Sequence, residues 1–400
     1  MSTPQKRPLG LRGRKQQQKN EDRQKKVRLN GEDNSFTVAL APSSASQADQ
    51  TTDGLTLEDL LQLKTQADEL IDNPSGLDED DDQLVNLLRG ICHEAIRQIE
   101  LAEKEEAEEE KETTRRASSY LLSLSHQLLG WASLELGIFL TLHQQSDRFV
   151  QDNEPKSLDA WLSIASKIFE NRPPSEKNPE GKSQTLADLE LLIPRSICLL
   201  KAEEPSEIAQ ILLDFDCPTW NREQSVYLLR TIDRIILFKY EAISQDPTPI
   251  FRIIIKLLEG ILNKNDTEGD DGKTFQRLLD QRLGDCYLAH GSLLAEKLEE
   301  KYYPEQDEEQ TTEEEEFAID VQDPTYILSL ENLRRADRIF SKLIEDMDET
   351  SESKAELKTK LDETLLTIGN LLPPGSEREE LYLRAGLSGD NDDGNGGDGK

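Results

Sequence analysis

The chain has 400 residues, of which 35% are hydrophobic and 32% are charged, and its formal net charge is −34. No run is long and apolar enough to predict a membrane span, because the best one, from Ile250, is short and contains Arg252, Lys256 and Glu259. Four dispersed cysteines form no CxxC pair and there is no visible signal peptide, which favours a reducing compartment over a disulfide-rich secreted protein.

The charge is strongly segregated. Residues 1–29 hold ten basic and two acidic residues, a net charge of +8, which leaves −42 for the remaining 371 residues. With few large apolar side chains, residues 1–50 are predicted to be a disordered basic arm. Within it the "KKVR" run and an upstream cluster have the form of a two-part nuclear-localisation signal, made of Arg12, Arg14, Lys15, Lys25, Lys26 and Arg28. The alternative is an arm that contacts nucleic acid or the ribosome.

Residues 51–388 are predicted to be one helical-repeat domain. The chain has 60 leucines and 6 valines, and this composition favours helices over strands. The first helix follows Thr56, a predicted N-cap with Asp59 three residues on. A second spans about 82–111, and a third, apolar on all sides and expected to bend near Gly130, follows it. Pro155 is expected in the first turn of the next helix.

Further helices are predicted at about 184–202, 205–214, 221–244, 247–263, 274–302, 324–347, 353–372 and 376–387. Asp323 and Pro324 form an N-cap followed by an N1 proline, and Ser353 with Glu356 predicts a capping box. Residues 304–323 are expected to form an acidic loop, and residues 389–400 a disordered acidic tail. Short turns between the helices favour antiparallel pairs, so the predicted fold is all-α, an α-α superhelix.

Fragments of a tetratricopeptide-like repeat support this architecture. Leu283, Gly284 and Tyr287 have the spacing of its first helix, and Ala336 and Phe340 have the spacing of its second. The glycine would allow the two helices to approach closely. No two complete 34-residue units align, so we predict strongly diverged repeats, with an irregular helical domain as the alternative.

No catalytic or metal-binding motif is found. The four histidines lie in no HExxH, HxD or HxE pattern, and there is no Walker A, GxGxxG or GxSxG sequence. His93 is expected on the core-facing side of its helix, and the cysteines are expected to be small core residues. We therefore predict a non-enzyme without metal or cofactor. Ser118, in "RRASS" near an expected helix N-terminus, fits a basophilic kinase site.

Five stretches, in order, resemble a known family: "KRPLGL" (6–11), "LLRGICHEAIRQIE" (87–100), "ASLELGIF" (132–139), "LGDCYL" (283–288) and "IGNLL" (368–372). The family is that of the fungal nuclear regulators called enhancer of translation termination, or negative regulator of the prolyl-hydroxylase-like oxygenase. The resemblance implies an all-helical, tetratricopeptide-like protein without catalytic activity. Its implied partner is a 2-oxoglutarate and Fe(II)-dependent dioxygenase in the nucleus.

The expected function is thus a nuclear adaptor that binds and inhibits this dioxygenase. The adaptor would stabilise a sterol-regulatory, hypoxia-response transcription factor and aid nuclear import of the dioxygenase. One alternative is control of translation termination through the same partner, and another is an acidic nuclear chaperone for a basic client. An enzyme of an unrecognised type is a third class. An import receptor would bind the arm, a membrane is not an expected partner, and the acidic body would repel nucleic acid. A cytoplasmic pool is left open.

Overall fold

The computed structural model describes residues 56–72, 78–108, 112–143, 149, 151, 154–172, 192–215, 221–263, 270–303, 319–347 and 352–387. In these residues the regular structure consists of thirteen α-helices, with no β-strand. The predicted all-α superhelix is confirmed. The basic arm and the acidic tail lie outside the described residues, and the domain boundaries at 51 and 388 stay predictions.

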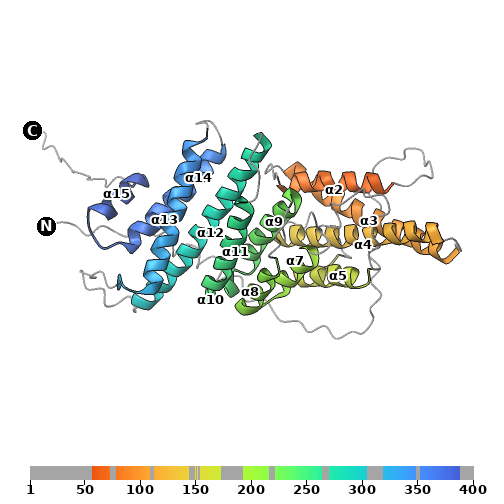
Figure 1. Ribbon diagram of the computed structural model, residues 1–400, viewed down its shortest axis with the longest axis horizontal. Helices are drawn as coiled ribbons and strands as arrows, with labels where there is room; N and C mark the ends of the chain where they lie inside the picture. The colour runs from red at the N-terminus through yellow and green to blue at the C-terminus, as the bar shows by residue number, and fades with distance from the viewer. Residues whose placement is uncertain are drawn as a thin grey trace, which may run out of the picture.

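The helices follow one another along an elongated body (Figure 1). Those of the first part are α2 (Leu57–Asp72), α3 (Asp78–Glu108), α4 (Glu112–Leu142), α5 (Leu158–Glu170), α7 (Leu192–Lys201) and α8 (Pro205–Leu213). The second part contains α9 (Arg222–Phe238), α10 (Tyr240–Gln245), α11 (Pro247–Leu262), α12 (Asp270–Tyr302), α13 (Pro324–Glu345), α14 (Glu352–Leu371) and α15 (Ser376–Arg384). Helices α2, α3 and α4 lie along the long axis of the view, whereas α11 to α14 stand across it.

Neighbours in sequence are neighbours in space, and the most extensive contacts are those of α3 with α4 and of α12 with α13. The buried residues of all these helices merge into one hydrophobic core, which includes Trp131, Phe215, Phe251 and Phe340. Each helix packs mainly on the next one along the chain, so the core is built from contacts between neighbouring helices. This is the physical basis of a solenoid.

Glycines set the spacing of three helix pairs. A Cβ atom on Gly284 would lie 2.7 Å from Cε1 of Phe340, so only glycine permits this approach of α12 to α13. The prediction that Gly284 lets two helices come close is therefore confirmed. Helices α14 and α15 also approach closely at a glycine, because a Cβ on Gly369 would lie 2.6 Å from Cε1 of Tyr382.

The third pair, α4 and α5, was not found from the sequence. A Cβ on Gly130 would lie 2.4 Å from Cε2 of Phe169, and Ala165 precedes Phe169 by four residues, as Ala336 precedes Phe340. The repeat spacing is present in α5, but Ser133 stands in α4 where the pattern wants tyrosine. Gly130 is therefore a packing residue inside one continuous helix, and the bend expected near it stays a prediction.

Capping explains several helix starts. Asp59 N donates to Thr56 Oγ1 at 3.3 Å and Thr56 N donates to Asp59 Oδ2 at 2.8 Å, so the predicted capping box of α2 is confirmed. Asp323 also caps α13 as predicted, with Thr325 N donating to its Oδ1 at 2.7 Å. A reciprocal box of Asn221 and Gln224 begins α9 and was not predicted.

Three boundary predictions were wrong. Pro155 precedes α5, because Ser157 is the N-cap and accepts from Ala160 N at 3.3 Å. Ser353 lies inside the first turn of α14, which begins at Glu352, and so does not cap it. The helix expected over 221–244 is divided at Lys239 into α9 and α10.

The end of the predicted acidic loop is described from residue 319. Ile319 is buried in the core, and Asp323 accepts hydrogen bonds from Lys301 Nζ at 2.6 Å and from Tyr302 Oη at 3.1 Å. These contacts from Lys301, Tyr302 and the backbone hold the pKa of Asp323 well below its usual range. The last residues of this segment thus anchor α13 to the C-terminal end of α12.

Candidate functional site

The predicted site residues fall mostly beyond the described part of the chain. The six basic residues of the localisation signal lie in residues 1–55, for which no structure is given. Ser118 lies in the second turn of α4, which begins at Glu112, and its side chain is not described. The structure therefore brings none of these residues together, and both site assignments stay predictions.

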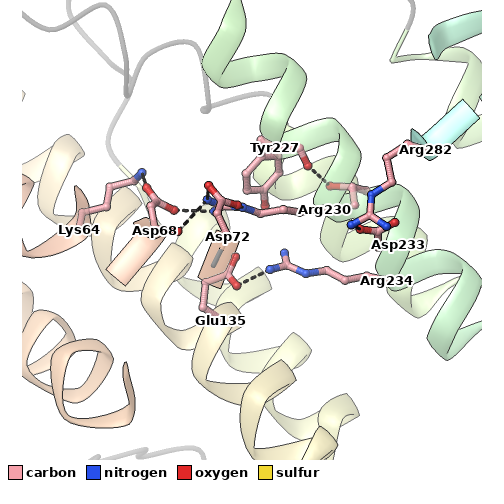
Figure 2. A network of polar contacts seen from close by, with 10 residues as sticks. Lys64, Asp68, Asp72, Glu135, Tyr227, Arg230, Asp233, Arg234 and Arg282 are labelled. Atoms are coloured by element: carbon pink, nitrogen blue, oxygen red, sulfur yellow. Dashed lines mark hydrogen bonds and ion pairs between the residues drawn. The ribbon is translucent and has the colours of Figure 1, made fainter. Parts of the chain in front are cut away.

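A polar network centred on α9 is the most unusual feature of the described body (Figure 2). Arg230 joins two carboxylates of α2, with its Nη1 atom 2.5 Å from Asp68 Oδ1 and its Nε and Nη2 atoms 2.6 and 2.7 Å from the two oxygens of Asp72. Lys64 Nζ lies 2.5 Å from Asp68 Oδ2 and 4.8 Å from the centre of the Trp131 ring. Burial alone would lower the pKa of Arg230, but Asp72 and Asp68 outweigh it and the pKa rises.

The deepest ion pair joins α9 to α4. Arg234 Nη2 donates to Glu135 Oε2, and the two side chains expose only 9% and 3% of their surface. Within the described residues, Glu135 Oε1 and Arg234 Nη1 are buried without a hydrogen-bond partner. A buried pair with unsatisfied atoms gains its Coulomb energy against a large desolvation cost. Such a pair stabilises the fold little compared with apolar residues of similar size, yet removing one partner leaves an isolated buried charge.

The network continues to the C-terminal helices. Asp233 of α9 accepts from Arg282 of α12, Nη2 to Oδ2 at 3.0 Å, and Lys360 of α14 lies 3.0 Å from Asp285 Oδ1. Arg282 also approaches Asp285 at 3.4 Å. One face of α9 thus reaches α2 and α4 on one side and α12 on the other. Charged contacts therefore connect α9 to helices of both parts of the superhelix.

The chemistry available to this network is limited at neutral pH. Burial, and then the nearby carboxylate of Glu135, raise the pKa of Tyr227 far above its ordinary value, so its hydroxyl stays protonated. The Arg230 guanidinium remains charged because of the neighbouring Asp72 and Asp68. The network is therefore a set of fixed charges and donors that can position helices or bind an opposite charge.

Sequence reasoning did not identify these residues, although a signal was present. Glu135 is the only charged residue between Ser118 and Ser146, in a helix that is otherwise apolar on all sides. Arg230 and Arg234 recur four residues apart among Tyr227, Leu228 and Ile235. A charge at a position that the helical period buries predicts a partner across the interface. The sequence does not say which helix supplies that partner.

Only some of the cysteines and histidines are buried packing residues. Burial raises the pKa of the Cys92 thiol to about 12 and also raises that of Cys286. Cys198 is exposed, contrary to expectation, and Cys217 lies outside the described residues. His93 is also exposed rather than core-facing. In the described ranges no group of three or more His, Cys, Asp or Glu residues is placed to hold a metal ion, and no helix there could span a membrane.

A groove of about 490 Å³ lies between α2 and α3. Half-buried Leu63 and Leu87 give it apolar walls, and the exposed residues Gln83, Asn86 and Gly90 complete it. A Cβ on Gly90 would meet no atom within 4 Å. At Gly90, α3 thus presents backbone without a side chain to the groove.

Comparison with known proteins adds no relative. No family model matches the chain, and no curated protein or solved structure matches it significantly. Fold and site are therefore interpreted from the residues themselves.

Proposed function

We propose that this chain is a non-catalytic nuclear adaptor that binds another protein on its helical superhelix. The observation that supports this most directly is the architecture: an elongated stack of helix pairs with an open apolar groove between α2 and α3. Solenoids offer extended side surfaces for binding, and affinity comes from a few buried anchors. The basic arm carries the nuclear-localisation signal that an import receptor binds.

The partner class rests on the family resemblance. Four of its five stretches lie in described helices, where they contribute buried residues such as Cys92, Leu134, Cys286 and Ile368. These stretches support the implied fold, whereas the partner comes from the resemblance alone. We therefore propose a 2-oxoglutarate and Fe(II)-dependent dioxygenase, inhibited by occlusion of its surface, with stabilisation of a hypoxia-response transcription factor as the outcome. Control of translation termination through the same partner is the other branch.

Affinity purification from fungal nuclear extract tests the proposal. The full chain is the bait, an unrelated protein of similar net charge is the control, and the eluate is compared after washes at low salt and at several hundred millimolar salt. Recovery of a 2-oxoglutarate dioxygenase near one-to-one, persisting at high salt, is expected, because groove contacts are screened little. The absence of any dioxygenase from the low-salt eluate would overturn the proposal.

A second candidate is an acidic chaperone for a basic client, favoured by the net charge of −42 outside the arm. Its signature in the same experiment is recovery of histones or ribosomal proteins that are lost as salt rises, because such binding is dominated by screened charges. The two functions therefore separate by the identity of the bound protein and by its salt dependence.

A further inference from the structure

Most of the described helical glycines make room for a neighbouring helix, and two do not. Glycine is unfavourable inside a helix, so its presence there needs a compensating gain. At five positions the gain is visible, because a Cβ would lie within 3 Å of a side chain of the neighbouring helix: Gly130, Gly137, Gly284, Gly291 and Gly369. Gly90 and Gly260 have no atom within 4 Å of that point. Of these two, Gly90 lines the groove between α2 and α3.

We propose that this groove is filled by a segment of the same chain, residues 35–42, "SFTVALAP". This segment contains the most apolar run of the first 55 residues, with Phe36, Val38 and Leu40 among polar neighbours. The leucines of the groove, Leu63 and Leu87, supply an apolar surface for such side chains. Gly90 lets the backbone of the docked segment approach α3 as closely as Phe340 approaches Gly284.

The groove also suits a peptide backbone. Gln83 and Asn86 are exposed at its edge, and each amide side chain carries both a donor and an acceptor. They can bond the N–H and C=O groups of an extended segment without requiring a particular charge. A docked segment therefore keeps its backbone hydrogen bonds, which apolar walls alone could not provide.

Chain length permits this arrangement. The residues outside the structure end at Leu55. Thr56 caps α2, and Leu63 lies seven residues beyond Thr56, a distance of about 10 Å along the helix. The connection 43–55 can extend over about 40 Å, so the segment reaches the groove easily. Covalent attachment also gives it a high effective concentration there, ahead of a free competitor.

A second copy of the chain is a weaker occupant. Two bodies that each carry a net charge of −42 outside the arm repel one another, whereas docking within one chain brings no second body close. Docking in this way would hold the import signal at 25–28 close to the first helices of the superhelix. A partner protein that needs the groove would have to displace the segment.

Photo-crosslinking in the full chain tests the inference. Phe36→p-benzoylphenylalanine is illuminated, and the crosslinked peptides are mapped by mass spectrometry. We expect crosslinks within one chain to α2 near Leu63 and to α3 between Gln83 and Gly90. Crosslinks that map elsewhere, or no crosslinks, would overturn the proposal. Crosslinks between chains that increase with protein concentration would assign the groove to a second copy instead.

A matched pair of variants supplies the control. Gly90→Leu fills the groove and should reduce the crosslink yield at least tenfold, whereas Gly260→Leu, at the other glycine with open surroundings, should leave it unchanged. Leucine favours the helix more than glycine does, so neither variant should unfold the chain. An equal effect of both variants would contradict the inference.

A binding measurement gives an independent readout. A labelled peptide of residues 30–45 is titrated into the native full chain and into the F36S/L40S full chain. The peptide should bind the F36S/L40S chain at least tenfold more tightly, because the native segment no longer competes for the groove. Equal affinities for the two chains would overturn the proposal.

Discussion

Arg234 on α9 donates a hydrogen bond to Glu135 on α4, and the two side chains are almost fully buried among apolar residues. This contact joins two helices that are 99 residues apart in sequence. It belongs to a network of charged contacts that joins α9 to α2, α4 and α12.

The first prediction concerns this pair. Glu135→Leu or Arg234→Met alone should lower the free energy of unfolding by about 3–5 kcal/mol, because each leaves one buried charge unpaired. The double variant should be close to the native chain in stability, since both desolvation costs are removed together. Urea unfolding of all four chains measures this. Effects that simply add in the double variant would show that the two side chains are not coupled.

The second prediction concerns the clamp that Arg230 forms on α2. Arg230→Lys keeps the charge but loses the planar fork that contacts Asp68 and Asp72, so the chain should lose about 2 kcal/mol of stability. Amide hydrogen exchange should accelerate most in α2. Arg334→Lys is the control, because its pair with Glu377 is largely exposed and should contribute under about 0.5 kcal/mol. Unchanged exchange in α2 would contradict the clamp.

The third prediction concerns close helix packing. Gly284→Ala should destabilise the chain by about 1–3 kcal/mol, because the new methyl group would lie 2.7 Å from Phe340 Cε1. Gly260→Ala should instead stabilise it by up to about 1 kcal/mol, since nothing lies near that site and alanine favours the helix. Thermal unfolding gives the comparison. The same sign for both changes would show that glycine does not set the α12–α13 spacing.

The fourth prediction concerns pH. The ring of His290 stacks on that of Phe251, with ring centres 5.2 Å apart. Its Nδ1 atom accepts a hydrogen bond from Asn332 Nδ2 at 3.0 Å, and its Nε2 atom lies 3.4 Å from Thr248 Oγ1. Burial, with a smaller contribution from Arg252, lowers the pKa of His290 to about 4. The unfolded chain therefore binds a proton between pH 6.5 and 4 that the folded chain does not.

Stability should accordingly fall as pH falls through that window, by up to about 3 kcal/mol from this residue. Urea midpoints measured between pH 7 and 4 test it, with His290→Gln as the comparison. The variant should show a shallower dependence on pH, because it has no group to protonate there. Identical slopes for the two chains would mean that His290 keeps an ordinary pKa.

The fifth prediction concerns the arm. Replacing Lys25, Lys26 and Arg28 with alanine in a fluorescently tagged full chain should reduce the nuclear-to-cytoplasmic ratio several-fold, because an import receptor reads clustered basic side chains in acidic pockets. Replacing Lys6, Arg7 and Lys19 removes the same charge outside the predicted signal and should have little effect. Equal losses for the two variants would favour a general charge effect over a defined signal.

Much of the fold could be predicted because local sequence carries the information. Thr56 with Asp59, and Asp323 with Pro324, mark helix starts through contacts within three residues. Errors occurred where a distant contact decided the role of a residue. The sequence did not show that Gly130 makes room for the ring of Phe169 from α5. Cys198 and His93 looked like core residues because their neighbours are apolar, yet both point to solvent.

The sequence by itself determined the class of this protein: leucine-rich helical periods, short turns and a charge split between a basic arm and an acidic body. Those features depend on residues close together in the chain. Only the tertiary structure decided that Glu135 pairs with Arg234, that Arg230 holds α2, and that Gly90 faces an open groove. A helical period states which face is buried but not which helix covers it, and that choice is made by packing across the whole core.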